Sequence, residues 1–315
     1  MLVRMKIAGA GGVAAVLGAA TLWGTVGPAQ VLASTDVDPV ALGALRLIGG
    51  GTILFGLVAV RDRATFGRWR SLGRGGALGW LLLAAAATAA YQAAFLSSVD
   101  RTGAALSTVV TLGVAPPAVG ALARLGGGER LTRPWIFGTV AAVAGTAVLL
   151  LPDASVRLDT FGVVLGIVGG LCYGVYTVAA KRLLDSAAPT FAAVATTLVL
   201  GGAMMLPFTG DVPRAFAEPD AFALVGWLAG PATALGYFLF VSGLRHVTAS
   251  TAGTLSLAEP LVAAVLGVVL LGERLSLPAT AGAVLLLAGL LIATMPAPRR
   301  RRSATPRHLL AEGAA

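Results

Sequence analysis

The sequence has few of the residues from which catalytic and metal sites are usually built. Its 315 residues include one cysteine, Cys172, and two histidines, His246 and His308. One cysteine excludes an intrachain disulfide and a thiolate metal cluster. Neither histidine lies in an apolar stretch, so a histidine-based metal site inside a membrane is also excluded. No glycine run continues into Lys-Ser or Lys-Thr, as a phosphate-binding loop requires, so no metal and no nucleotide cofactor are expected.

Charged residues are also scarce. They make up 12% of the chain, about half the share of a typical soluble domain, whereas 57% of the residues are hydrophobic and the mean hydropathy is +0.87. A soluble protein of this size cannot bury so much apolar surface in one core. A disordered chain would be poor in apolar residues. The solvent of this chain is therefore expected to be largely a lipid bilayer.

Long apolar stretches are what the sequence has in abundance. A membrane-spanning helix needs about 20 mostly apolar residues. The chain contains ten such segments: 7–27, 38–60, 76–97, 103–123, 134–151, 161–180, 189–209, 221–243, 247–271 and 278–296. The first is similar to a secretory signal peptide, but its counterpart in the second half of the chain favours a retained helix. We expect an all-α integral membrane protein with ten transmembrane helices.

The basic residues indicate an orientation in the membrane. The chain has 23 Lys and Arg against 14 Asp and Glu, a net charge of +9. In a soluble protein this excess would suggest nucleic acid as a partner, but here the basic residues stand in short runs between apolar stretches. If the N-terminus is inside, 18 of the 23 lie in cytoplasmic segments and four in external ones. The positive-inside rule then predicts a multi-pass protein of the cytoplasmic membrane with both termini in the cytoplasm.

The two halves of the sequence repeat each other. The tetrapeptide Gly-Glu-Arg-Leu occurs at 128–131 and again at 272–275, an offset of 144, and Pro116 matches Pro260 at the same offset. Nearer the start of each half the offset is 150, and it changes only between matching blocks, as loops of different length would cause. Composition alone does not give such fixed spacings.

Each copy of the repeat contains five spans, an odd number. The second copy must therefore enter the membrane upside down relative to the first. We expect two inverted five-helix repeats, at 7–151 and 161–296, followed by a basic cytoplasmic tail at 298–315. Inverted repeats recur in secondary transporters, where the substrate site lies near the midplane between the two halves.

Several motifs in these repeats carry a family resemblance. They are Trp23-Gly24 and Tyr173-Gly174 in the first helix of each repeat, Pro39 to Arg46, and Ser256 to Pro260 followed by Leu271 to Leu275. With these motifs the chain resembles the drug/metabolite transporter superfamily, specifically its EamA type. The resemblance implies a ten-helix inner-membrane carrier of small metabolites, often an exporter. The first repeat departs from the pattern, because Ala115 stands where Glu259 stands in the second.

Two charged residues lie deep within the predicted spans. Glu259 is the one acid deep in a span, where a charge costs at least about 2.5–3.5 kcal/mol, so such residues usually face a cavity. It is a candidate proton carrier, or else a brace for the helix beside Pro260. Arg46 is the one base, and it either holds a substrate carboxylate, pairs with Glu259 or extends toward the interface. Pro116 and Pro260 are expected to kink corresponding helices, as moving hinges or static packing features.

Aromatic and polar side chains within the spans are candidates for a substrate cavity. Pockets for small molecules are mostly apolar and contain a few polar groups. The candidates are Trp23, Arg46, Tyr91, Gln92, Tyr173, Tyr176, Tyr237 and Ser256. The alternative for some of them is packing or an interfacial aromatic belt.

These features favour a secondary transporter that exports amino acids or amphipathic metabolites and drugs by alternating access. The alternatives are an importer or a proton-coupled carrier of sugars or nucleotide sugars. An integral-membrane enzyme needs a cluster of His, Asp or Glu, and a non-transporting scaffold is a further class. A small-molecule substrate and the bilayer are the expected partners, nucleic acid is not, and the sequence indicates no oligomeric state.

Overall fold

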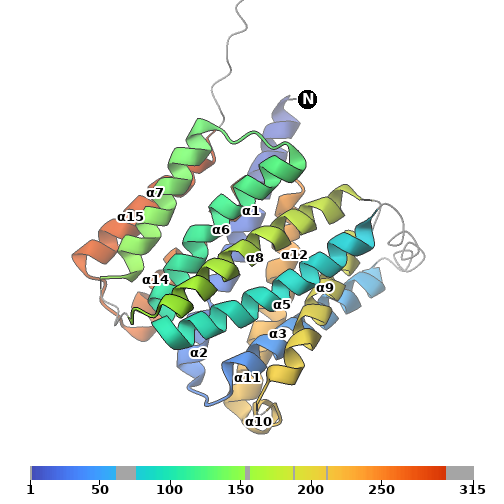
Figure 1. The fold of residues 1–315 in the computed structure, drawn as a ribbon, viewed down its shortest axis with the longest axis vertical. Coiled ribbons are helices and arrows are strands. Elements are labelled where there is room, and N and C mark those ends of the chain that lie inside the picture. The colour runs from blue at the N-terminus through green and yellow to red at the C-terminus, as the bar shows by residue number, and fades with distance from the viewer. Residues whose placement is uncertain (1, 62–75, 153–156, 187–188, 211, 296–315) are drawn as a thin grey trace, which may run out of the picture.

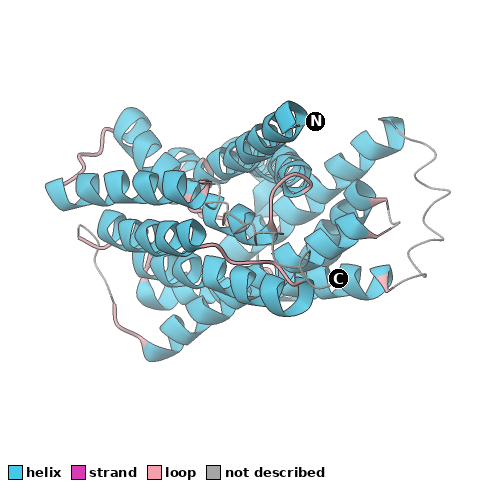
Figure 2. Ribbon diagram, turned by 90° about the horizontal axis from the view of Figure 1, so that it is seen from above, coloured by secondary structure: helices cyan, strands magenta, loops and turns pink. Residues whose placement is uncertain are grey.

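The protein is a bundle of helices. The computed structural model describes residues 2–61, 76–152, 157–186, 189–210 and 212–295, and all regular structure in these ranges is helical (Figure 2). The expectation of an all-α protein is confirmed. The predicted basic tail at 298–315 lies outside the described residues.

The helices follow the two predicted repeats. The first repeat contains α1 (Leu2–Gly24), α2 (Val26–Ala33), α3 (Pro39–Arg61), α5 (Ala77–Thr102), α6 (Ala104–Gly127) and α7 (Arg133–Leu150). The second contains α8 (Thr160–Asp185), α9 (Thr190–Met205), η2 (Leu206–Phe208), α10 (Arg214–Ala217), α11 (Pro219–Trp227), η3 (Leu228–Leu235), α12 (Gly236–Leu244), α13 (Ala249–Leu255), α14 (Ala258–Leu271) and α15 (Leu277–Ala293).

Ten apolar segments correspond to the ten predicted spans. Within the described ranges, nine helical segments are long and apolar enough to cross a membrane, and α15 has 17 residues. At 1.5 Å per residue, α15 is about 26 Å long, close to the thickness of the hydrocarbon core. The first span was predicted to end at residue 27, but its apolar helical segment continues to Ala33. A new helix begins after Thr25, and Pro28 lies in its first turn, where proline costs no hydrogen bond.

The ninth span is interrupted between α13 and α14. Pro260 has no N–H and cannot donate to the carbonyl of Ser256, as a continuous α-helix would require. The Ser256 carbonyl instead accepts from the N–H of Glu259 at 3.0 Å, and the N–H of Leu257 donates to Thr254 at 3.0 Å. These shorter-range bonds place Ser256 and Glu259 at a break in the span. The corresponding helix α6, by contrast, continues through its own proline pair as one helix.

The two repeats are inverted relative to each other. By sequence, α7 and α15 are equivalent helices, and they lie side by side (Figure 1). A Cβ on Gly138 would meet Ala293 and the carbonyl of Gly289, and a Cβ on Gly282 would meet Leu149. As the residue number rises along α7, that of its partner falls along α15, so equivalent helices run in opposite directions. This antiparallel crossing is the structural form of the inverted repeat.

Equivalent glycines also make equivalent contacts elsewhere in the bundle. Gly174 of α8 packs against Ala118 of α6, and Gly24 of α1 packs against Val262 of α14. Each pair joins the first helix of one repeat to the fourth helix of the other. At Gly24 an added Cβ would also meet the backbone carbonyl of Glu259 at 2.7 Å. This glycine therefore lets α1 lie directly against the break in the ninth span.

Candidate functional site

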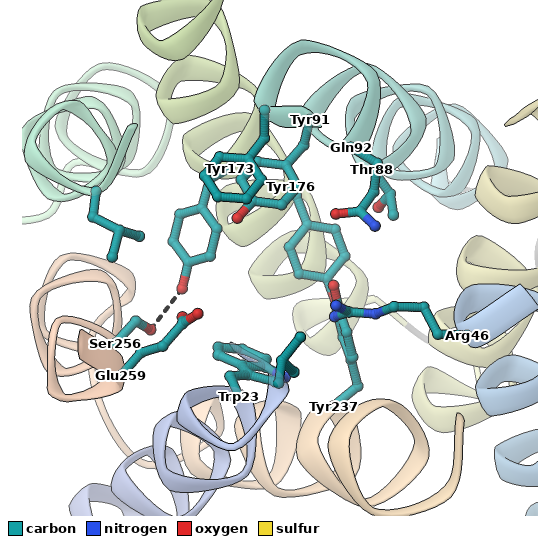
Figure 3. Close-up of a pocket in the computed structure, with 13 residues that line it drawn as sticks. Trp23, Arg46, Thr88, Tyr91, Gln92, Tyr173, Tyr176, Tyr237, Ser256 and Glu259 are labelled. Carbon is teal, nitrogen blue, oxygen red and sulfur yellow. Dashed lines mark hydrogen bonds between the residues drawn. The ribbon is translucent and has the colours of Figure 1, made fainter. Parts of the chain in front are cut away.

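A cavity of about 110 Å³ lies between the two repeats. Its wall comes from α1, α2, α3, α5 and α6 of the first repeat and from α8, α12, α14 and the α13–α14 break of the second. The lining residues are Trp23, Val26, Arg46, Thr88, Tyr91, Gln92, Phe95, Leu112, Tyr173, Tyr176, Tyr237, Ser256 and Glu259 (Figure 3).

All eight residues that the sequence suggested for a substrate cavity, and Glu259 as well, line this one space. They come from positions up to 236 residues apart, because 259 − 23 = 236. The two proposed kink residues, Pro116 and Pro260, do not line it. That these residues bind a substrate remains a prediction of the sequence, and the cavity shows that they can act on one molecule together.

The two charged side chains face the cavity from opposite walls. Arg46 extends from α3 on one side and Glu259 from α14 on the other, with aromatic rings around the space that separates them (Figure 3). Both are half-buried, and they are not in ion-pair contact with each other. A molecule with a negative and a positive group at its two ends would meet a complementary charge at each end.

Aromatic rings form the walls between the two charges. The ring centroids of Trp23 and Tyr237 are 5.5 Å apart, and those of Tyr176 and Tyr237 are 5.6 Å apart at an interplanar angle of 84°. The ring centroids of Tyr91 and Tyr173 are 6.2 Å apart. Such edge-to-face arrangements hold rings in place. The site therefore offers a rigid, apolar middle section between two charged ends.

Several polar atoms of this wall have no hydrogen-bond partner among the residues that the structure describes. They are Nε1 of Trp23, Nε of Arg46 and the hydroxyl of Tyr176. A buried donor without a partner costs about 1–3 kcal/mol. The indole of Trp23 lies close to Gly236, where an added Cβ would come within 2.8 Å of Nε1. All three atoms are buried against neighbouring protein atoms in this state.

One pair of hydroxyls ties the cavity wall to the break in the ninth span. The hydroxyls of Tyr173 and Ser256 are 2.6 Å apart, and Ser256 is within 3.1 Å of the carbonyl of Ala252 (Figure 3). If Ser256 donates to that carbonyl, Tyr173 donates to Ser256. The segment just before α14, which carries Glu259 in its first turn, is thereby linked to α8.

Four lining residues were not among the sequence candidates. Val26, Phe95 and Leu112 are apolar, and nothing in their sequence context distinguishes them from packing residues. Thr88 is 3% exposed and its hydroxyl bonds its own helix at the carbonyl of Ala84, at 2.8 Å. The π-helical segment η3, which contains Pro231 and precedes Tyr237, was also missed. That proline was a signal, because irregular turns in a membrane helix often occur at functional sites.

The comparison with protein families decides the identity of the chain. A model described as the EamA-like transporter family matches twice, at residues 10–151 and 160–295. The chain belongs to the EamA-like transporter family. Two copies of the EamA domain account for the inverted architecture, and the resemblance inferred from the sequence is confirmed. The protein is a membrane transporter and not an enzyme.

Relatives of this EamA transporter cover nearly the whole chain. It is 34% identical over 295 residues to "Uncharacterized transporter YwfM" of Bacillus subtilis (strain 168), covering 93% of this chain and 97% of that one. It is 27% identical to "Uncharacterized inner membrane transporter YicL" of Salmonella typhimurium, covering 92% and 97%. A solved structure, described as a crystal structure of a protein, matches with a TM-score of 0.75 at 21% identity, covering 90% and 96%. This last likeness concerns the fold alone.

Proposed function

We propose that this transporter moves small zwitterionic metabolites, amino acids first among them, across the cytoplasmic membrane by alternating access. The observation that carries the proposal is the pair Arg46 and Glu259 on opposite walls of one aromatic cavity (Figure 3). Arg46 would hold the carboxylate of an amino acid and Glu259 its ammonium group. The rings of the wall would hold an apolar side chain, so aromatic and aliphatic amino acids and amphipathic metabolites fit best.

A nucleotide sugar, the main alternative, fits this cavity less well. A diphosphate needs several cationic or N–H donors, and Arg46 is the one cation among the lining residues that the structure describes. The acidic Glu259 would also repel a phosphate. We therefore favour zwitterions over phosphorylated substrates, and export over import because Glu259 can return a proton as the substrate leaves.

Substrate exchange in proteoliposomes tests this function. Purified protein should exchange labelled phenylalanine or leucine against the same unlabelled amino acid inside the vesicle. Phenethylamine, which lacks the carboxylate, and phenylpropionate, which lacks the amine, should each exchange at least about tenfold more slowly, because a hydrogen bond to a charged group contributes about 1.5–3 kcal/mol. Vesicles without protein give the background. Equal exchange of the amino acid and either analogue would contradict the proposed roles of Arg46 and Glu259.

The orientation in the membrane follows from the basic residues and can be tested separately. We expect the cavity mouth to face outward, because Trp23, Val26 and Phe95 lie in the outer halves of spans whose later ends are predicted to be external. A reporter enzyme active only outside the cytoplasm should be active when fused after Asp36 and inactive when fused after Asp185. A cytoplasmic reporter should give the opposite pattern at both sites. The same location for both fusions would contradict the topology.

A further inference from the structure

The Gly-Glu-Arg-Leu motif forms the same backbone structure in both repeats. Gly128 ends α6 with φ 65°, and Gly272 ends α14 with φ 70°, both left-handed. After each glycine, the N–H of the glutamate donates back to a carbonyl of the preceding helix, at 3.2 Å for Glu129 and 3.1 Å for Glu273. The two glutamates therefore leave their helices in the same local geometry. A difference between their side-chain partners reflects the packing of the bundle and not the loops.

Glu129 belongs to the first repeat, and its side chain binds the backbone of the second. Its two carboxylate oxygens accept hydrogen bonds from the N–H groups of Ala249 and Ser250, at 2.8 and 3.2 Å. These are the first N–H groups of α13, which a helix itself leaves without partners. Beside them, the indole N–H of Trp135 donates to the carbonyl of Ser250 at 3.0 Å. We call this end of the bundle the closed end, because α13 packs against α6 and α7 here.

Glu273 has no such partner at the other end. It is exposed, and among the described residues its carboxylate forms no hydrogen bond or ion pair, lying beside Gly267 of its own helix. Its equivalent target is the start of α6, at Ala105 and Leu106, which lie 144 residues before Ala249 and Ser250. In the part of the chain that the structure describes, no side chain caps this helix. At the closed end α13 packs against α6 and α7. The repeat makes the start of α6 equivalent to α13, α14 equivalent to the end of α6, and α15 equivalent to α7. In the described structure α6 packs extensively against neither α14 nor α15, so we call this the open end.

We propose that Glu129 and Glu273 are alternating latches, each of which caps the helix of the other repeat when its own end of the bundle is closed. In the state seen here Glu129 is engaged and Glu273 is free. In the opposite state Glu273 caps α6 and Glu129 is released. The proposal rests on the proposed alternating-access function and adds the contact that holds each state.

The chemistry of a helix start explains why glutamate serves this purpose. The first N–H groups and the helix dipole attract a carboxylate. The attraction is strong only when the two repeats approach at that end, since each glutamate belongs to one repeat and its target to the other. The inverted symmetry places one latch at each end, so closing one end separates the other pair. The two residues therefore bias the same equilibrium in opposite directions.

Distances between spin labels report both ends of the full-length protein in lipid nanodiscs. A Cys172→Ala background leaves no native cysteine. One labelled pair, Arg130→Cys with Arg245→Cys, spans the closed end. The equivalent pair is Arg274→Cys with Arg101→Cys, which spans the open end. Arg274 corresponds to Arg130 and Arg101 to Arg245, each at the repeat offset of 144 residues. All four side chains are exposed. Each pair should give a short and a long distance, in opposite states.

Removing one latch should change the ratio of the two states. Glu129→Ala should raise the population with a long Arg130–Arg245 distance about fivefold, the size expected for the loss of one helix cap. Adding Glu273→Ala to that variant should lower it again by a similar factor. Gln at either position keeps one acceptor oxygen and should have a smaller effect of the same sign, which excludes a general folding defect.

Matched controls remove one exposed carboxylate near each end without touching a latch. Asp185→Asn serves the Glu129 end and Asp36→Asn the Glu273 end, and neither should change the ratio. The two states could be populated in a ratio that changes with neither glutamate variant, or that changes in the same direction with both. Either result would overturn the latches and leave the proposed transport intact. One distance population in every variant would contradict alternating access and the latches together.

Discussion

Glu259→Gln should abolish proton-driven accumulation of substrate, and it should also slow substrate exchange by at least about tenfold, because the ammonium group loses its charged partner. The amide has the shape of the carboxyl but cannot take up or release a proton. With one proton moved per substrate, a gradient of one pH unit sustains about a tenfold concentration ratio of substrate, which corresponds to about 1.4 kcal/mol. In the variant this ratio should fall to about one. The measurement is uptake into proteoliposomes with and without an imposed pH gradient.

Glu259 is suited to this role by its place in the fold. It lies in the first turn of α14, directly after the break at Ser256, so its access to the cavity depends on a short and irregular segment. A charge in such a place is costly, and a small change in solvent access decides whether the carboxyl holds its proton. Glu259→Asp should keep partial coupling. Gradient-driven uptake by Glu259→Gln at the wild-type level would instead make the residue a helix brace.

Gly145→Ala should strongly destabilise the protein, although alanine is the better helix former. A Cβ at this position would overlap the backbone nitrogen of Leu286, where α7 and α15 cross in closest contact. A backbone atom cannot move aside as a side-chain end can, so the cost should exceed the about 1–3 kcal/mol typical of overpacking. Thermal unfolding in detergent, followed by loss of the monodisperse peak, measures the effect. Gly289→Ala, the equivalent change in the second repeat, should act similarly.

Gly56→Ala is the matched control for this crossing. Gly56 lies within α3, and no atom is near enough to meet an added Cβ. There the higher helix propensity of alanine, about 1 kcal/mol in exposed helix interiors, acts alone. The melting temperature should therefore stay the same or rise slightly. Equal effects of Gly56→Ala and Gly145→Ala would show that the crossing tolerates wider separation.

The helices and their inversion could be predicted because each rests on a local property of the chain. Apolar stretches of about 20 residues partition into lipid wherever they stand. An odd number of spans per repeat then requires inversion. The ends of the spans were less accurate: the first continues to Ala33, since the proline at 28 fits a first helical turn and is no stop signal. Pro260 indicated the interruption at Ser256. The π-helical turn at Pro231, in contrast, was not recognised.

The sequence pointed to most of the polar and aromatic residues that line the cavity, but not to its apolar lining residues. Polar and aromatic side chains are rare inside spans, which is why Arg46, Tyr237 and Glu259 were singled out. The apolar lining residues Phe95 and Leu112 could not be separated from lipid-facing or packing residues, since all three environments select the same side chains.

The sequence alone determined the membrane environment, the ten spans, the repeat and its inversion, because hydropathy and the spacing of motifs are local properties of the chain. The tertiary structure alone decided which side chains share a cavity and which of two identical motifs is engaged. Glu129 and Glu273 both stand in a Gly-Glu-Arg-Leu motif with the same backbone structure, yet Glu129 caps a helix and Glu273 has no such partner within the described ranges. That difference depends on how far apart the two repeats lie at each end, a distance that no local pattern records.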